Sequence, residues 1–339
     1  MSRPLTVALT AVRRERYPIR GGFTISRGSK REAEVLVAEL SGETSDGRTV
    51  SGRGECLPYA RYGETVDGVL AAIEAQAGNL ARGMDRLDLQ REMPAGAARN
   101  ALDCAFWDLE AKTAAVPVWR LAGLHGPWVP VVTAFTISLG TPERMGEAAL
   151  GAAAMPLLKL KLGGDPDDLA RTAAVRRNAP AARIIVDANE SWTIEQLTDL
   201  APRLSELGVE LIEQPLPADG DIALANFRSP VPLGADESCH GTLSLKRLKG
   251  LYQIVNIKLD KAGGLTEALR LKVAAEQAGF GIMVGCMVAT SLAMAPAFLL
   301  AQGAAFADLD GPLLLERDRE PGIAYDAAWM QPPPAALWG

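Results

Sequence analysis

The sequence predicts an α/β fold in which a (β/α)7β TIM-like barrel follows an N-terminal α+β capping domain. From about residue 130, eight short apolar runs recur about every 25 residues, and most of the segments between them have helical spacing. Before residue 125, alternating strand-like runs give way to helices instead. We therefore expect the capping domain over residues 1–125, joined by the C-terminal tail 316–339, and the barrel over residues 126–315.

The first region contains signals for both strands and helices. "LTVALTAV" and "REAEVLVAEL" alternate as strands do, and "RTVSGRGEC" follows the turn-rich "SGETSDG", which predicts a hairpin. In "AARNALDCAFWDLEAK", apolar residues share one face at helical spacing, which predicts an amphipathic helix. These residues are Ala98, Ala101, Leu102, Ala105, Phe106 and Leu109.

The second region contains the eight runs expected to form barrel strands. They are "VVTAFTI", "PLLKLKL", "ARIIVDA", "VELIEQP", "VPLGADE", "QIVNIKL", "GIMVGCM" and "AFADLDG". Helices are expected between most of them, for example in "TIEQLTDLAPRLSELG" and "LTEALRLKVAAEQAG". The last run precedes "GPLLLERDREPGIAYDAAW", which has little helical pattern. We therefore expect the eighth helix to be missing and the tail to return to the first domain.

Composition excludes several classes of partner. The 339 residues carry a net charge of −6, which gives no electrostatic reason to expect nucleic acid or a membrane surface as partner. No stretch resembles a signal peptide or a membrane span. The four cysteines are widely spaced and form no CxxC pair, which is typical of a cytoplasmic protein. A homo-oligomer is compatible with the sequence.

Charged residues lie at the ends of most predicted strands. Catalytic groups of such barrels come from the C-terminal ends of strands, so these positions predict an active site. The residues are Lys159, Lys161, Asp187, Glu213, Asp236, Lys258, Asp308 and Asp310.

Three consecutive predicted strands each end in one carboxylate. These are Asp187, Glu213 and Asp236, and oxygen ligands of this kind suit a hard cation, most plausibly Mg²⁺. A helix cap or a surface ion pair would explain any one of them alone. Three in succession favour a metal site.

The lysines have the placement expected of a pair of bases. Strands 2 and 6 of an eight-stranded barrel are diametrically opposed, so Lys161 and Lys258 would face each other across a substrate. This geometry suits removal of a proton from one face of a carbon and its return on the other; the alternative is that the lysines extend to the rim. Lys159 shares a strand face with Lys161. At about 7 Å and a dielectric near 20, their repulsion is roughly 2.4 kcal/mol, or nearly two pKa units, so we expect Lys159 to tune Lys161 as a base.

Several motifs resemble a known family. "KLKL", "VDANESW", "LIEQPLP", "GADESCH" and "VNIKLDKAGGLTEA" resemble the muconate lactonizing enzyme-like subgroup of the enolase superfamily. A lysine or histidine base beside Mg²⁺ is a general property of that superfamily. Within it, "FADLDGP", "GECLPYARYGET" and "PAGAARNALDCAFWDL" resemble the bacterial dipeptide epimerases that act on L-Ala-D/L-Glu in peptidoglycan recycling.

The resemblance implies a function and a set of roles. The chain would be an isomerase that inverts the α-carbon of a dipeptide's C-terminal residue through a metal-stabilised enolate. Asp187, Glu213 and Asp236 would hold Mg²⁺, and Lys161 and Lys258 would be the bases. The Asp-x-Asp of strand 8, Asp308 and Asp310, would bind the substrate's α-ammonium group.

A loop of the first domain is expected to cover the site. "FTISRGSKREAE" resembles the loop in which a basic residue pairs with the substrate's glutamate side chain. Lys30 stands where that family has arginine, and lysine lacks the bidentate fork for a carboxylate. Arg27 lies nearby and could compensate. A solvated loop charge is the alternative for both residues.

The sequence features are compatible with other functions. A cycloisomerase, an o-succinylbenzoate synthase or an N-acylamino acid racemase could use the same scaffold, but Asp308 and Asp310 favour a substrate with an ammonium group. A Schiff-base aldolase or a noncatalytic peptide-binding protein is disfavoured by the three carboxylates and the two bases. Lys261 is the alternative to Lys258, and Cys286 is expected to line the pocket or pack in the core.

Overall fold

A computed structural model of the chain describes residues 7–44 and 46–339. The start of the strand predicted in "LTVALTAV" and Ser45 of the predicted turn lie outside these described residues. In the described part of the chain, no helix combines the length and the apolarity needed to cross a bilayer.

The N-terminal region forms an antiparallel sheet covered by helices, as predicted. Its strands are β1 (Val7–Ile25), β2 (Gly28–Glu43) and β3 (Thr49–Cys56), in the order β1-β2-β3. The helices that follow are α1 (Val66–Glu74), α2 (Ala77–Ala81), α3 (Arg86–Glu92), α4 (Ala97–Ala114) and α5 (Val118–Leu121). Helix α4 is the helix expected in "AARNALDCAFWDLEAK".

Two glycines of β3 let α4 pack directly on the sheet. A Cβ at Gly54 would collide with the carbonyl oxygen of Ala101, and one at Gly52 would collide with that of Ala105. Alanine and glycine therefore face each other where the helix and strand backbones are closest.

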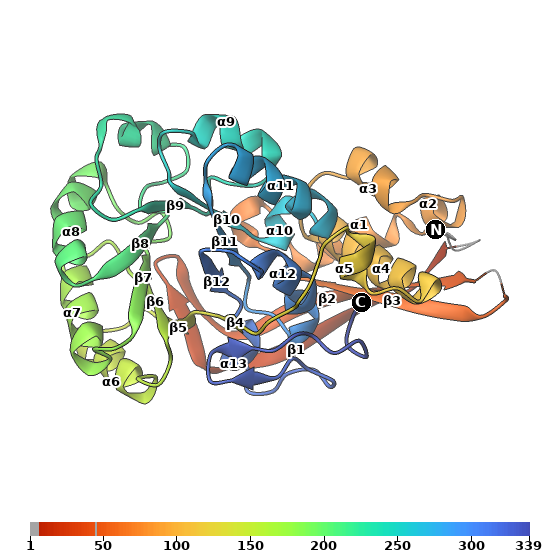
Figure 1. Ribbon diagram of the computed structural model, residues 1–339, viewed down its shortest axis with the longest axis horizontal. Helices are drawn as coiled ribbons and strands as arrows, with labels where there is room; N and C mark the ends of the chain where they lie inside the picture. Colours follow the sequence, from red (N-terminus) through yellow and green to blue (C-terminus); the bar gives the residue numbers. More distant parts are fainter. Residues whose placement is uncertain (1–6, 45) are drawn as a thin grey trace.

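The second region is the predicted barrel, a sheet of eight parallel strands in chain order from β5 to β12 (Figure 1). Its strands are β5 (Phe135–Ile137), β6 (Leu157–Lys161), β7 (Arg183–Asp187), β8 (Val209–Glu213), β9 (Leu233–Ala235), β10 (Ile254–Ile257), β11 (Gly281–Gly285) and β12 (Phe306–Asp308). Ahead of β5, Ala134 donates a backbone hydrogen bond of 2.8 Å to Ala307, which brings the first and last strands together.

The first predicted strand differs from the structure at its start. Val131 and Val132 form a separate short strand, β4 (Val131–Val132), which pairs with β14 (Trp329–Met330) near the C-terminus. Strand β14 pairs in turn with β13 (Tyr325–Asp326). The apolar run "VVTAFTI" therefore serves two sheets, which periodicity along the chain does not reveal.

Helices cover the outside of the barrel unevenly. The long ones are α6 (Pro142–Gly151), α7 (Asp168–Asn178), α8 (Ile194–Glu206), α11 (Leu265–Gln277) and α12 (Ser291–Ala301). The short ones are α9 (Leu245–Leu248), α10 (Leu259–Ala262), α13 (Gly311–Leu314) and the 3-10 segments Asp221–Asn226 and Thr242–Ser244; a third 3-10 segment, Ala60–Tyr62, belongs to the N-terminal region. Among the described residues, only the four-residue α13 follows β12, so the expected loss of a full eighth helix is confirmed.

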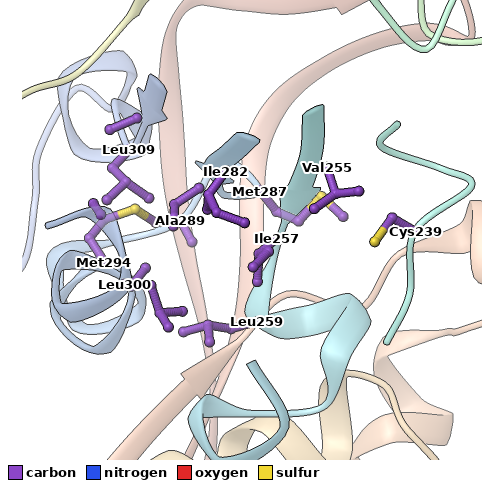
Figure 2. Packing of buried hydrophobic residues seen from close by; sticks show 14 of the residues in the cluster. Cys239, Val255, Ile257, Leu259, Ile282, Met287, Ala289, Met294, Leu300 and Leu309 are labelled. Atoms are coloured by element: carbon purple, nitrogen blue, oxygen red, sulfur yellow. The ribbon is translucent and has the colours of Figure 1, made fainter. Parts of the chain in front are cut away.

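The outward strand faces and the helices share one apolar core. Met294 and Leu300 of α12 pack in the same buried cluster as Ile257 of β10 and Ile282 of β11 (Figure 2). This packing holds the helices against the outside of the barrel.

The first region contacts the rest of the molecule at helix α4 and at the closed end of the β1–β2 hairpin. The tail returns to α4, where the indole nitrogen of Trp338 donates to the carbonyl of Cys104 at 3.0 Å. The closed end of the β1–β2 hairpin lies beside the loop after β7, where Ser26 Oγ donates to the carbonyl of Asn189 at 3.2 Å (Figure 1). The covering segment predicted over residues 23–34 is therefore the tip of a hairpin and not an irregular loop.

Candidate active site

The period-two alternation of the strands divides the barrel interior into two layers. The lower layer is a buried apolar cluster of Ala134, Leu157, Ile185, Leu211, Ile254, Met283 and Phe306. The upper layer lies two residues further along each of the same strands: Thr136, Lys159, Asp187, Glu213, Asn256, Gly285 and Asp308. Residues two apart share a face, so the strands that pack the interior also bring the charged groups together.

The three predicted metal ligands meet as expected of a cation site. One carboxylate oxygen from each of Asp187, Glu213 and Asp236 lies within 4.8 Å of the others, and all three side chains are buried. Glu213 Oε1 accepts a 2.7 Å hydrogen bond from Asn256, while Oε2 is paired with the ammonium group of Lys159 at 2.6 Å. Burial and the neighbouring Asp187 raise the pKa of Glu213 to about 7. A hard cation would be coordinated by these three converging carboxylates and would relieve their mutual repulsion, so the residues fit a divalent metal.

The two predicted bases flank this triad from opposite sides. Lys161 Nζ lies 2.6 Å from Asp187 Oδ2, and Lys258 Nζ lies 2.6 Å from Asp236 Oδ2. Because the strands run in the order β6 to β10, these two pairs lie on either side of Glu213. Although burial opposes it, Lys258 keeps the pKa of Asp236 well below its usual range.

Lys159 has acidic partners that the sequence argument did not count. Its Nζ lies 2.6 Å from Glu213, 2.7 Å from Asp308 and 3.2 Å from Asp187. Although burial opposes the charged form, these carboxylates hold the pKa of Lys159 well above its ordinary value. The strand tolerates two like charges because Lys159 and Lys161 each have an acidic partner; the tuning role of Lys159 stays a prediction.

Asp308 and Asp310 lie at the end of β12, and Lys159 connects Asp308 to the triad carboxylates Asp187 and Glu213. Asp308 Oδ2 pairs with Lys159, while its Oδ1 is buried without a hydrogen bond. Asp310 Oδ2 accepts from the backbone N–H of Thr136 at 2.6 Å. Burial and the charge of Asp308 raise the pKa of Asp310 to about 7. The pair therefore has spare acceptor capacity for a cationic group.

One cavity of about 610 Å³ connects these groups under the capping domain. The lining includes most of the predicted site residues: Lys161, Asp236, Lys258, Asp308, Asp310, Lys30 and Arg27. Lys159, Asp187 and Glu213 lie outside this lining and are fully buried. Most of the predicted residues thus line one cavity, and the other three are buried next to that lining.

Lys30 and Arg27 differ in how their charges are engaged. Arg27 donates to Glu237 Oε1 at 2.7 Å, to Tyr59 Oη at 3.1 Å and to the Asn189 carbonyl at 2.9 Å. Lys30 Nζ lies 5.2 Å from the centre of the Tyr59 ring, and burial lowers its pKa. Within the described part of the chain Lys30 forms no ion pair, so it is the better placed of the two to meet an anionic substrate group.

Sequence reasoning missed some site residues and left others open. Asn256 shares the inward face of β10 with Lys258, a signal that the spacing of "VNIKL" contained. A Cβ at Gly285 would meet the side-chain oxygen of Asn256 at 2.6 Å, so glycine leaves room for that amide. Lys261 is buried and donates to Asp236 and to the Asn256 carbonyl, which makes it a support for a ligand. Cys286 lines the cavity.

Comparisons with known proteins identify the class. The mandelate racemase/muconate lactonizing enzyme N-terminal domain model matches residues 6–123, and the enolase C-terminal domain-like model matches residues 144–326. The chain belongs to the enolase superfamily, as the motifs predicted. It is an isomerase of the epimerase and racemase type.

Particular relatives cover nearly the whole chain. It is 48% identical to L-Ala-D/L-Glu epimerase of Escherichia coli (92% of this chain, 95% of that one) and 48% identical to N-acetyl-D-glutamate racemase of a Pseudoalteromonas species (85% and 91%). A solved enolase family member from Agrobacterium tumefaciens, described with bound sodium and L-Ala-L-Glu, has a TM-score of 0.93 and 50% identity, covering 98% of this chain and 100% of that one. A dipeptide epimerase from Enterococcus faecalis, complexed with Mg and L-Leu-L-Tyr, has a TM-score of 0.87 and 28% identity (97% and 98%).

Proposed function

We propose that the chain is a Mg²⁺-dependent dipeptide epimerase that inverts the α-carbon of the C-terminal residue, with L-Ala-D/L-Glu as the leading substrate. One observation carries the proposal: a single cavity is lined by both predicted bases, by the triad carboxylate Asp236 and by the aspartate pair, and the bases lie on either side of the carboxylate triad. The epimerases among the relatives support it. A role in peptidoglycan recycling and a cytoplasmic location are part of the proposal.

The metal would be held by Asp187, Glu213 and Asp236. When bound, Mg²⁺ would act as a Lewis acid that stabilises negative charge on the substrate carboxylate as the α-proton leaves. Asn256 orients Glu213 and Lys261 orients Asp236 through the hydrogen bonds described above. These contacts hold the ligand oxygens in place before the cation arrives.

The two lysines would exchange the proton. One of Lys161 and Lys258 accepts the α-proton at its Nζ, and the other donates a proton from its Nζ to the opposite face of the carbon. Their placement on either side of Glu213 supports this division of roles. Lys159, held by three carboxylates, would remain protonated and contribute positive charge beneath the reacting centre.

The ends of the dipeptide would be recognised by charge. Asp308 and Asp310 would accept hydrogen bonds from the α-ammonium group, which would satisfy the orphaned Oδ1 of Asp308. Lys30, which reaches into the same cavity, would pair with an acidic side chain on the second residue. Since lysine lacks the fork of arginine, we expect this preference to be weaker than with arginine.

An N-acylamino acid racemase is the second candidate. The specific observation is the relative named N-acetyl-D-glutamate racemase, as similar in identity as the dipeptide epimerase. An acylated nitrogen carries no charge, so it would bring no cation to the unbonded Oδ1 of Asp308 or to Asp310, and the two aspartates would continue to repel each other. This repulsion favours the dipeptide.

The test is incubation of a dipeptide library in D₂O with Mg²⁺, scored by mass gain at the α-carbon. N-acetyl-L-glutamate and N-acetyl-L-Ala-L-Glu are included in parallel. Mass gain concentrated in free dipeptides with an acidic second residue supports the proposal. Equal or greater exchange in the N-acylated compounds would replace it with racemisation of N-acylamino acids.

A further inference from the structure

One carboxylate outside the predicted site connects the capping domain to the barrel. Glu190 lies in the loop after β7, three residues beyond Asp187. Asn189 and Glu190 both have positive φ, 45° and 69°, a left-handed conformation that is uncommon for residues other than glycine. This turn directs the Glu190 side chain toward the capping domain, where it is largely buried.

Glu190 binds two arginines that come from separate capping segments. Arg61 donates to it through a fork, with Nε 2.7 Å from Oε2 and Nη2 2.7 Å from Oε1. Arg27 Nη1 donates to Oε2 at 3.2 Å, and the backbone N–H of Ala218 donates to Oε1 at 2.9 Å. Both carboxylate oxygens are therefore used, and the bidentate geometry with Arg61 is the strongest that such a pair adopts.

The two arginines sit on the parts of the capping domain that close the cavity. Arg27 is in the turn of the β1–β2 hairpin, near Lys30, and Arg61 is in the 3-10 segment that follows Tyr59. Lys30, Tyr59 and both arginines line the cavity. Glu190 thus joins both segments to the loop that begins at the triad ligand Asp187.

We propose that Glu190 is a latch that holds both capping segments over the cavity and so positions Lys30 and Tyr59 against the bound substrate. It touches none of the groups assigned to proton transfer, so it is a positioning residue. The activity part of this inference rests on the proposed function, whereas the closure of the two segments does not.

The latch predicts a particular kinetic pattern. In Glu190→Gln the charge is lost while the size is kept, so Arg61 loses its ionic partner and the segments open more often. We expect KM for L-Ala-L-Glu to rise about tenfold, the equilibrium effect of one charge-assisted hydrogen bond, with kcat changed far less. Raising the salt concentration should increase the KM of the wild type and have less effect on the variant, since an ionic contact is screened.

The test that does not depend on turnover is hydrogen exchange of the full chain with Mg²⁺ and without substrate. In Glu190→Gln, the backbone amides of residues 23–30 and 57–62 should exchange faster, while the barrel strands are unchanged. Glu210→Gln is the matched control, because Glu210 accepts a similar fork from Arg183 at the start of β7, with Nε 3.1 Å from Oε1 and Nη2 2.6 Å from Oε2. Arg61→Lys keeps the charge but not the fork and should give an intermediate effect.

The outcomes separate the two proposals. If Glu190→Gln and Arg61→Lys leave exchange in both segments at the level of the Glu210→Gln control, the latch is wrong whatever the substrate. If exchange rises in both segments but the wild type acts on no dipeptide, the latch stands and the proposed function fails. Because Arg61 is 40% exposed, Arg61→Lys tests the latch even if Glu190→Gln does not fold.

Discussion

The two layers of the barrel interior differ in almost every physical property, although the same strands supply both. On β8, Leu211 of the lower layer packs in an apolar cluster, and Glu213, two residues later, is a buried carboxylate paired with Lys159. Apolar burial stabilises the fold, whereas a buried charge costs free energy unless it is paired. The lower layer therefore stabilises the fold, and the upper layer contributes the charged groups of the candidate site.

In the upper layer, ion pairs reduce the free-energy cost of burying charged groups. Lys159 contacts three carboxylates, and Lys161 and Lys258, each two residues beyond this layer, contact one each. Such pairing does not make the layer a source of stability, since the desolvation penalty of buried ion pairs is large. The layer is better explained by the reaction it supports.

The largest effect is expected from removing either of the two bases that adjoin the upper layer. Lys161→Ala and Lys258→Ala should each reduce epimerisation by roughly 10²–10⁴-fold, the usual contribution of a general acid or base. Each variant should still exchange the α-proton of the one stereoisomer whose proton faces the remaining lysine. The measurement is polarimetry beside deuterium incorporation into each stereoisomer. Epimerisation at near wild-type rate by either variant would contradict the assignment and make Lys261 the next residue to test.

A similar loss is expected at the substrate's amino end. Asp308→Asn and N-acetylation of L-Ala-L-Glu should each lower kcat/KM. We expect each change to raise the free energy of the transition state by roughly 2–5 kcal/mol, because each breaks a buried charge pair. The two changes should not add, since both remove the same interaction. A double-mutant cycle of wild type and variant on both substrates measures this. Fully additive losses would mean that Asp308 acts through Lys159 and not through the ammonium group.

The contrast between the layers is tested most directly on β8. Leu211→Ala should lower the free energy of unfolding by roughly 2–5 kcal/mol, the usual range for a buried leucine, while the folded fraction keeps its activity. Glu213→Gln should lower Mg²⁺-dependent turnover by roughly 10²–10³-fold. It should not destabilise the metal-free protein, since it removes one of three repelling carboxylates.

Urea unfolding in EDTA and turnover in Mg²⁺ measure the two quantities separately for each variant. The interpretation is wrong if Leu211→Ala inactivates the folded protein, or if Glu213→Gln destabilises the metal-free protein as strongly as Leu211→Ala does.

The smallest effect concerns a buried carboxylate outside both layers. Asp103 on α4 accepts hydrogen bonds from the Thr266 N–H, at the start of α11, and from Gln90, both at 2.9 Å. Burial raises its pKa from 3.8 to about 6. Between these values the unfolded chain has lost the proton that the folded chain keeps, so this group makes stability fall as pH rises from about 4 to about 6.

Asp103→Asn should remove this part of the pH dependence, roughly 2–3 kcal/mol across that window. The measurement is urea unfolding of the metal-free protein and the variant at pH 4 to 7. Parallel pH profiles for the two proteins would show that Asp103 does not titrate in this range.

Much of the site was predictable because strand ends converge in a barrel. The charged residues that end the predicted strands are far apart in the sequence, yet a parallel barrel brings all strand ends to one rim. Asp187, Glu213 and Asp236 could therefore be grouped as ligands, and Lys161 and Lys258 placed on opposite sides, from spacing alone. Asn256 was predictable in principle by the same rule.

Other features depended on contacts between distant segments. The acidic partners of Lys159 include Asp308, which approaches only because the last strand closes against the first. The engagement of Arg27 by Glu237 depends on where the hairpin tip meets the barrel. The division of "VVTAFTI" between two sheets depends on a C-terminal strand that occupies Val131 and Val132.

The fold class, the strand runs and the chemical type of the site could be predicted from the sequence, because hydrophobic periodicity and the order of charges along the chain are local properties. The tertiary structure decided which charge meets which: Lys159 with three carboxylates, Arg27 with the barrel, Lys30 with the cavity, and Glu190 with two capping segments. The physical reason is that the ionisation and pairing of a buried group depend on everything within a few ångströms of it. Those neighbours come mostly from residues remote in the sequence.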